Sequence, residues 1–355
     1  MTVVIDGKTL TIGKVVEVAR NNANVSVSDN SWKKINSCRK MLEEKINNHE
    51  TMYGITTGIG EFSEVTLDPG QTKEFQKLLI YSHAAGIGKP MDAEIVRGAM
   101  CGRINVHSKG HSGGRKEITE YLIEALNQNL TPVVCEKGSV GACGDLSPMS
   151  QIALSLMGEG EMIVEGEIID SKEALDAIGL KPLELEARDG LALINGSNVL
   201  TALAAITLHD AQKWMKLHDI AAAMTLEALM ANMKPYDKRI HELRGFSGSQ
   251  IIANNLNILT ENSEILFSGG KKVQDAYSMR STPQVAGTLR DSINYAITQV
   301  EIELNGVGDN PIFLTKEKDV LTGANFQGTP IALPMEMVGT GLSMVAVLSE
   351  RRMNR

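Results

Sequence analysis

The sequence predicts a mostly α-helical protein, with a long-helix bundle as its core and a smaller, loop-rich N-terminal α/β part. Aromatic residues make up only 4% of the 355 residues, and aliphatic side chains and 17 methionines supply most of the apolar material. That composition suits packed helices better than a β-sandwich, which draws on aromatic and β-branched residues. Helical patterns recur along the chain and become long beyond residue 183. The few long, glycine-containing breaks between them are of the kind that usually carries function.

The N-terminal part is predicted to begin with a hairpin over residues 3–12 that turns at Asp6-Gly7. A short helix is expected over residues 14–21. Ser28, Asp29 or Ser31 can cap a longer helix that should reach about residue 48. Residues 53–70 are rich in glycine, threonine and serine and are predicted to form a loop. Further helices are expected over residues 71–84, 91–108 and 115–128.

Two elements are predicted in the middle of the chain. A helix should begin near Ser147-Pro148, with the serine as its cap and the proline in its first turn. Residues 158–170 should form a two-stranded ribbon that turns at Glu165-Gly166.

Charge and termini exclude several classes of protein. The net charge is −8 and Lys and Arg are scattered along the sequence, so neither nucleic acid nor an anionic membrane surface is expected as a partner. The first residues lack the basic and apolar regions of a signal peptide, and no uninterrupted apolar run reaches the roughly 18 residues of a membrane span. We therefore expect a cytoplasmic protein.

Metal and disulfide sites are not expected either. The four cysteines, Cys38, Cys101, Cys135 and Cys143, show no CxxC spacing in this large chain. His107 and His111 have the spacing of helical zinc ligands, but neighbouring glycines make a helix at that point doubtful and no third ligand is evident.

Residues 138–145, GSVGACGD, form a second glycine-rich break. From spacing alone it is a turn with a buried cysteine, and it lacks both glycine patterns of phosphate-binding loops. A tight bend at Ala142-Cys143-Gly144 also permits a backbone reaction, in which the Gly144 nitrogen attacks the Ala142 carbonyl carbon. Loss of water closes a five-membered ring, and elimination of the Cys143 side chain gives 4-methylidene-imidazol-5-one. That group is an electrophile of a kind that cofactors normally supply.

The segment SVGACGDLSPMS (139–150) resembles the signature of the superfamily of histidine, phenylalanine and tyrosine ammonia-lyases and aminomutases. The usual triplet there is Ala-Ser-Gly, so Cys143 stands at the place of a serine, and its elimination would release hydrogen sulfide instead of water. Other segments resemble family motifs in family order: YGITTGIG (53–60), SHAAGIG (82–88), LALINGS (191–197), QDAYSMR (274–280), DNP (309–311) and NFQG (325–328). The resemblance implies an L-aspartase/fumarase-like fold and a self-formed imidazolone, with no metal or external cofactor.

The resemblance also implies roles for single residues. Tyr53 corresponds to the catalytic base, whose phenol pKa near 10 must be lowered for work at neutral pH. Arg280 corresponds to the clamp on the substrate carboxylate, because a guanidinium group can pair with two oxygens at once. Tyr277 and Gln274 are expected to orient the amine and the ring.

Four further residues complete the predicted site. Asn195 and Asn310 are expected to polarise the imidazolone carbonyl and the substrate carboxylate, and Phe326 to form a wall near the electrophile. In the family, a histidine at the place of His83 goes with polar substrate rings. Glu61 resembles a substrate contact of tyrosine 2,3-aminomutases. The runs GHSGGR (110–115) and GANF (323–326) also resemble tyrosine-type enzymes, and with Glu61 they favour tyrosine over histidine as the substrate.

Several functions remain open at this stage. The first is elimination of ammonia from tyrosine or histidine to the trans-acrylate, and the second is an aminomutase that adds the ammonia back at the β-carbon. A thiol enzyme with Cys143 as nucleophile would need a thiol of low pKa. A non-catalytic assembly partner would keep the fold and never cyclise.

The resemblance implies a domain division as well. Residues 1–190 are predicted to form the loop-rich catalytic domain with the electrophile, and residues 191–355 the first part of a central helical bundle. Family members continue beyond the point that matches Arg355 and share their sites between subunits. We therefore expect a homo-oligomer, a tetramer in the family, or a complex with a second chain that supplies the C-terminal half; a truncated product of low activity is the alternative.

Overall fold

A computed structural model describes residues 1–68, 70–139 and 143–355. The chain forms two compact units: unit 1 is Met1–Ile206 with Val300–Ile331, and unit 2 is Thr207–Gln299 with Ala332–Arg355. The predicted boundary after residue 190 falls inside helix α8 (Asp189–Ile194), which packs against α3 and α6 and so belongs to unit 1. The assignment of residues 1–190 as the catalytic domain stays a prediction.

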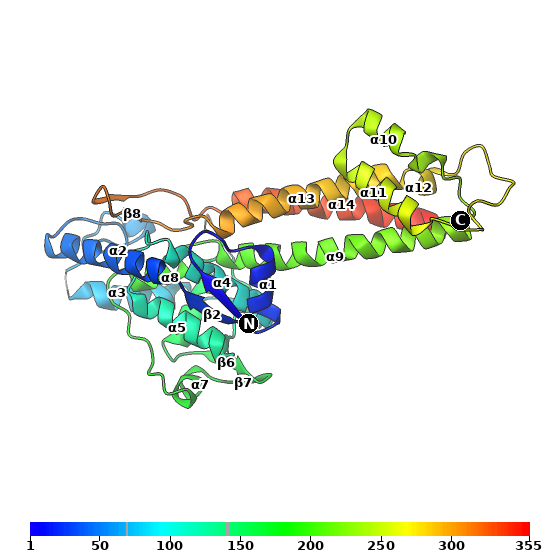
Figure 1. Ribbon diagram of the computed structural model, residues 1–355. Helices are drawn as coiled ribbons and strands as arrows, with labels where there is room; N and C mark the ends of the chain where they lie inside the picture. The colour runs from blue at the N-terminus through cyan, green and yellow to red at the C-terminus, as the bar shows by residue number, and fades with distance from the viewer. Residues whose placement is uncertain (69, 140–142) are drawn as a thin grey trace. The chain divides into compact units, whose positions relative to one another are not determined.

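Unit 1 is organised around helix α4, in which every residue from Val96 to Ser108 is buried. Helices α1, α2 and α5 pack directly against it (Figure 1). The helices of unit 1 that precede α9 are α1 (Ile12–Arg20), α2 (Asp29–Asn47), α3 (Gln71–His83), α4 (Ala93–Ser108), α5 (Lys116–Asn127), α6 (Leu146–Leu156), α7 (Ser171–Ala177) and α8, with a 3₁₀ turn η1 (Gly60–Phe62). The helices predicted over 71–84, 91–108 and 115–128 are therefore confirmed.

The first strand corrects the predicted N-terminal hairpin. Strand β1 (Thr2–Ile5) pairs in parallel with β2 (Asn24–Val27), and no strand forms at residues 10–12. The Asp6 carboxylate accepts the N–H groups of the next turn, and Thr11 then caps α1 by accepting from the Lys14 N–H. The chain therefore enters a helix instead of returning along β1.

The other strands form small sheets at the edges of unit 1. The ribbon predicted over 158–170 is confirmed as β6 (Glu161–Val164) paired with β7 (Glu167–Asp170). The remaining strands are β3 (Ile87–Pro90) with β5 (Cys135–Lys137), β4 (Thr131–Pro132) beside β6, and β8 (Ile312–Leu314) with β9 (Asp319–Leu321).

Helix caps were predicted with mixed success. Of the three candidate caps of α2, Ser28 is the cap, because its hydroxyl oxygen accepts the Ser31 N–H at 3.2 Å. Helix α6 begins at Leu146 with Asp145 as its cap residue, so the predicted cap at Ser147 is wrong. The Ser147 hydroxyl lies inside the first turn, buried and without a hydrogen-bond partner in the described part of the chain.

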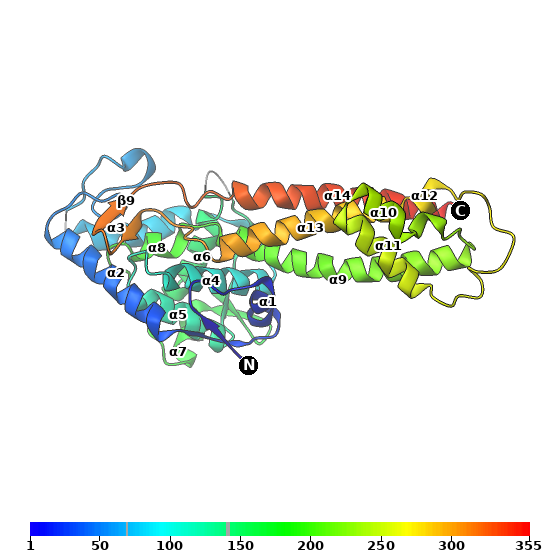
Figure 2. The ribbon, with the colours of Figure 1, turned by 45° about the horizontal axis from the view of Figure 1, so that its top comes forward.

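Unit 2 is built from long helices. In both views α9 (Asn198–Ala228), α13 (Thr282–Leu304) and α14 (Thr329–Met353) run side by side within this unit (Figures 1 and 2). The shorter helices are η2 (Lys234–Tyr236), α10 (Lys238–Arg244), α11 (Ser247–Leu259) and α12 (Tyr277–Arg280). Helices α11 and α13 approach closely at a pair of glycines, since a Cβ on Gly248 would lie 2.0 Å from the Gly287 carbonyl oxygen. The predicted mostly α architecture with long helices is confirmed.

Two helical stretches are long and apolar enough to cross a membrane by length and composition alone. In Asp189–Ala228 the apolar window is 83% buried within the protein, as expected for a core helix. In α14 the corresponding window is 33% buried.

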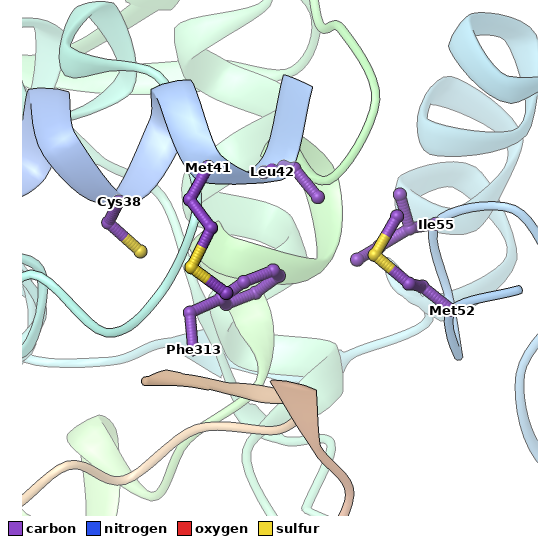
Figure 3. Close-up of a cluster of buried hydrophobic side chains, with 6 residues drawn as sticks. All are labelled: Cys38, Met41, Leu42, Met52, Ile55 and Phe313. Atoms are coloured by element: carbon purple, nitrogen blue, oxygen red, sulfur yellow. The ribbon is translucent and has the colours of Figure 1, made fainter. Parts of the chain in front are cut away.

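A cluster of buried side chains fixes the position of the loop that carries Tyr53. Met52 and Ile55, on either side of the Tyr53-Gly54 pair, face Met41 of helix α2 and Phe313 of strand β8 (Figure 3). Cys38 and Leu42 complete the cluster. The loop therefore has an anchored base, although it has no regular secondary structure there.

We expect Phe313→Ala to lower the free energy of unfolding by about 3–5 kcal/mol, because it leaves a cavity in the centre of this cluster. Denaturant titration of the full chain measures the change. Phe62, which is 68% exposed in the same unit, is the matched control. Phe62→Ala should change stability by less than about 0.5 kcal/mol. Equal losses in the two variants would contradict the anchoring role of Phe313.

Candidate active site

The Tyr53 loop holds its phenol in contact with the backbone. The Gly60 N–H donates to the Tyr53 hydroxyl oxygen at 3.2 Å. The contact therefore fixes where the phenol oxygen lies relative to the backbone of the loop.

Gln76 ties this loop to helix α8. Its side chain is fully buried, donates to the Gly54 carbonyl oxygen at 3.1 Å and accepts the Leu191 N–H at 3.1 Å. Gly54 has a φ of +66°, and a Cβ there would lie 2.4 Å from the Leu191 side chain. Only glycine allows this approach, so Tyr53 is held at a fixed position along α8.

Two of the predicted substrate contacts line one cavity. Glu61 on η1 and His83 at the end of α3 border a hollow of about 590 Å³, whose other walls are mainly apolar side chains such as Phe62, Val65 and Leu78. A volume of this size is typical of sites for small organic molecules. The structure therefore brings together Glu61 and His83, which are 22 residues apart in the sequence.

Hydrogen bonding fixes the proton of the His83 ring. Its Nδ1 lies 2.9 Å from the Leu79 carbonyl oxygen and 2.9 Å from the Ser82 hydroxyl. Because a carbonyl oxygen can only accept, we assign the proton to Nδ1. In the neutral ring Nε2 is then an acceptor, suited to the N–H of an imidazole or the O–H of a phenol.

The cysteine of the predicted triplet lies in a buried segment. Ala142 is outside the described residues, whereas Cys143 is 5% exposed and Gly144 has a φ of +79°, a conformation that favours glycine. The Ser197 hydroxyl lies 3.2 Å from the Cys143 carbonyl oxygen and 2.7 Å from that of Phe326. Ser197 therefore links the triplet to the predicted wall residue Phe326.

The environment of Cys143 disfavours the thiol-enzyme alternative. Burial raises the pKa of its thiol to about 11, against hydrogen bonds from the backbone of Asp145 and Gly196 that act in the opposite direction. A nucleophilic cysteine requires the reverse, a thiol pKa lowered toward neutrality. Cys143 is thus a neutral, enclosed thiol, compatible with a residue whose side chain is to be eliminated.

Asn195 and Asn310 lie in direct contact. The Asn195 amide donates to the Asn310 carbonyl oxygen at 2.8 Å, and the Asn310 side-chain oxygen accepts the Gly323 N–H at 2.8 Å. Asn195 directly follows helix α8. The same helix contains Leu191, whose N–H donates to the Gln76 side chain that holds the Tyr53 loop. Helix α8 therefore connects both asparagines to the predicted base.

A buried ion network lies beneath the asparagines. Asp309 accepts from Arg103 at 2.8 Å and from Arg188 at 2.7 Å, and all three side chains are fully buried. Arg103 also donates to the carbonyl oxygens of Ala192 and Asn195 at 2.6 and 3.2 Å. Two guanidinium groups face one carboxylate, so the network carries a net positive charge and fixes the backbone on which Asn195 is mounted.

The remaining predicted residues, Gln274, Tyr277 and Arg280, belong to unit 2. The guanidinium of Arg280 lies over the Tyr277 ring at 4.4 Å. Its Nε is buried without a hydrogen-bond partner, and Arg280 makes no ion pair with any residue that the structure describes. The side chain therefore has donors free for a carboxylate. Gln274 is exposed in the segment just before α12.

The two histidines considered for zinc make other contacts. His107 lies on helix α4 after all, with its ring nitrogens 2.9 Å from the Thr119 hydroxyl and the Ala192 carbonyl oxygen. His111 contacts the Phe313 carbonyl oxygen at 2.7 Å. Within the described ranges, no group of three or more His, Cys, Asp or Glu residues could hold a metal ion.

Sequence reasoning did not assign roles to Gln76, Arg103, Arg188 or Ser197. The side-chain partners named above lie 22 to 206 residues away in the sequence, so no local pattern marks them. Asp309 had a signal, because it begins the DNP motif, but its carboxylate was not assigned a function.

Comparisons with known proteins place the chain in a family. Residues 10–355 match the model of the aromatic amino acid lyases. Histidine ammonia-lyase of Alkaliphilus oremlandii (strain OhILAs) is 42% identical over 354 residues, which are 99% of this chain and 70% of that protein. The crystal structure of tyrosine aminomutase from Streptomyces globisporus matches with a TM-score of 0.94 at 33% identity, over 100% of this chain and 71% of the other.

A second solved structure is that of a histidine ammonia-lyase. The crystal structure of histidine ammonia-lyase from Trypanosoma cruzi matches with a TM-score of 0.90 at 33% identity, over 100% of this chain and 67% of the other. The chain therefore belongs to the aromatic amino acid lyase family. The predicted fold class and the prediction of an ammonia-lyase type of enzyme are confirmed.

We expect Asp309→Asn to lower the free energy of unfolding by about 3–5 kcal/mol, because it leaves two buried guanidinium groups without a carboxylate. Glu43→Gln is the matched control, since it breaks the ion pair between Glu43 and Arg39 in the same unit. The Glu43 side chain is 54% exposed. That pair should contribute less than about 1 kcal/mol. Denaturant unfolding of both variants tests the difference, and a loss below about 1 kcal/mol for Asp309→Asn would refute it.

Proposed function

We propose that this chain eliminates ammonia from an aromatic L-amino acid to give the trans-acrylate, with L-histidine as the first candidate substrate. The observation that carries the proposal is the burial of Cys143, whose carbonyl oxygen accepts the Ser197 hydroxyl at 3.2 Å. A thiol in this state is a poor nucleophile but can be lost from a cyclised backbone. Membership of the aromatic amino acid lyase family supports this chemistry.

The electrophile is proposed to form from the chain itself. The nitrogen of Gly144 bonds to the carbonyl carbon of Ala142 and one water leaves. The Cα proton and the S–H group of Cys143 then leave together as hydrogen sulfide, and a Cα=Cβ double bond remains. The left-handed φ of Gly144 and the enclosure of Cys143 fit a bend at this position. Once formed, the imidazolone supplies an electron sink that side chains do not offer.

Tyr53 is proposed to remove the β-proton of the substrate. That proton is barely acidic, so the base must be a phenolate held in position. The Gly60 N–H contacts the Tyr53 oxygen, and the Gln76 contacts hold the loop to α8. Asn195, fixed by Arg103 and by the Asn310 carbonyl oxygen, is proposed to polarise the imidazolone carbonyl.

The substrate carboxylate is assigned to Arg280, whose guanidinium has donors free of described partners. Tyr277 and Gln274 are proposed to orient the amine and the ring of the substrate. Asn310 is proposed to contact the substrate carboxylate, and Phe326 to form one wall of the site near the electrophile. These assignments rest on the motif positions.

His83 and Glu61 bear on the choice of ring. With the ring proton assigned to Nδ1, the Nε2 of His83 is an acceptor suited to an imidazole N–H or a phenol O–H. Histidine is placed first because histidine ammonia-lyases are 42% identical to this chain. Tyrosine is the second candidate, since Glu61 lines the same cavity and a tyrosine aminomutase shares the fold. An aminomutase would differ in returning the ammonia to the β-carbon.

The partners proposed are a small aromatic amino acid and other polypeptide chains, either copies in a homo-oligomer such as a tetramer or a second chain. Cytoplasmic location is proposed on the grounds of the sequence. Similarity to bacterial histidine ammonia-lyases over 99% of the chain supports this setting.

Intact-mass measurement tests the electrophile. The purified chain should be lighter by one water and one hydrogen sulfide, and the deficit should map to the Ala142–Gly144 peptide. Cys143→Ser should lose two waters instead, because a hydroxyl then leaves from the same carbon. Cys143→Ala has no leaving group and should show no elimination. A wild-type chain of full mass with an alkylatable Cys143 would rule out the imidazolone.

Steady-state kinetics tests the assignment of His83. His83→Phe should lower kcat/KM for histidine by at least about tenfold relative to phenylalanine, because the polar ring loses its hydrogen-bond partner. Lys77→Ala is the control, because Lys77 lies on the same helix α3 but does not line the cavity of Glu61 and His83. An unchanged ratio in His83→Phe would refute the role of His83, and a β-amino acid as main product would show an aminomutase.

A further inference from the structure

Four lysines that are scattered in the sequence converge on one pocket of unit 1. Lys8 follows strand β1, Lys34 lies on α2, Lys109 ends α4, and Lys316 lies in the turn between β8 and β9. The pocket has a volume of about 460 Å³. In a chain of net charge −8, such a concentration of positive charge needs a physical explanation.

The charge of this lysine pocket is not neutralised by the protein. Two carboxylates, Asp6 and Glu317, line it against the four lysines. Asp6 already accepts the N–H groups of Lys8 and Thr9 in its own turn. Among the described residues, none of the four lysines forms an ion pair. The lining therefore has an excess of two positive charges, without counting His111.

Two of the lysines are built into the fold and are not freely solvated. The stem of Lys109 packs on Gly7, where a Cβ would lie 2.8 Å from the Lys109 Cγ. In the same way, a Cβ on Gly110 would lie 2.5 Å from the Lys34 Cβ. Lys109 Nζ donates to the carbonyl oxygens of Gly7 and Asn305 at 3.1 and 2.5 Å. An ammonium group has three donors, so one remains for a ligand.

Crowding of like charges makes this arrangement costly in the absence of an anion. Burial lowers the pKa of Lys109, and the charges of Lys8 and Lys34 lower it further, against the opposite effect of the Asp6 carboxylate. The negative charge of a bound anion would offset the repulsion among the ammonium groups. Lysines act as point charges toward oxyanions, and a multivalent anion can contact several of them at once.

We propose that the lysine pocket is a binding site for a small multivalent oxyanion. The shared chemistry is a compact group of anionic oxygens, as in phosphates and in polycarboxylates. The site is separate from the cavity lined by Glu61 and His83, so it is an addition to the proposed reaction and does not depend on it.

Calorimetric titration of the full chain at low ionic strength tests the proposal, with inorganic phosphate, tripolyphosphate and citrate as probes. Saturable binding of at least one probe that weakens with added salt is expected. Tighter binding of tripolyphosphate would assign phosphate chemistry to the site, and tighter binding of citrate would assign carboxylate chemistry. Absence of saturable binding with all three probes would overturn the proposal.

A pair of double variants tests the location. Lys8→Ala with Lys316→Ala removes two exposed lysines of the pocket and should weaken binding at least about tenfold. Lys89→Ala with Lys172→Ala removes two exposed lysines elsewhere in unit 1 and changes the net charge equally. That control should bind as the wild type does, and an equal loss in both double variants would refute a defined site. Circular dichroism checks that each variant folds.

Discussion

Two guanidinium groups share one carboxylate in the interior of unit 1, and the geometry of the candidate site depends on that contact. Asp309 alone would be an unpaired buried charge, and so would either arginine. Together they hold the carbonyl oxygens of the α8 backbone and of the segment at Asn310. Because α8 also contacts Gln76, the same network determines where the Tyr53 loop lies. The polar interior thus acts as a rigid base for groups that come from three distant parts of the chain.

Most of the helical architecture could be predicted from local signals. Ser28 marks the start of α2 because its side chain caps the next turn, an interaction contained within four residues. The parallel pairing of β1 with β2 could not be predicted in this way, because residues 10–12 carry the same apolar pattern as a strand and the true partner begins at Asn24. The prediction of Ser147 as the cap of α6 was wrong for a similar reason. Asp145 precedes the helix, and its carboxylate accepts the Leu200 N–H of a distant helix.

The candidate site could be predicted as a set of segments but not as a geometry. Motif order identified the loop of Tyr53, the His83 segment and the strip ending at Ser197. The sequence did not show that Gln76 joins two of these segments, or that Ser197 joins Cys143 to Phe326, since such contacts bridge many residues. The same limit applies to charge. The lysines look dispersed along the chain, and only the fold brings Lys8, Lys34, Lys109 and Lys316 to one pocket.

The spacing of the ion network along the chain has a consequence for biosynthesis. Asp309 is 206 residues beyond Arg103 and 121 beyond Arg188, so both arginines leave the ribosome long before their carboxylate is made. Packing them into an apolar interior at that stage would strand two unpaired charges. Unit 1 therefore cannot complete its interior while its first 300 residues are being translated. The nascent chain must wait in a partly open state, with apolar surface accessible to chaperones, until the last segment of the unit arrives.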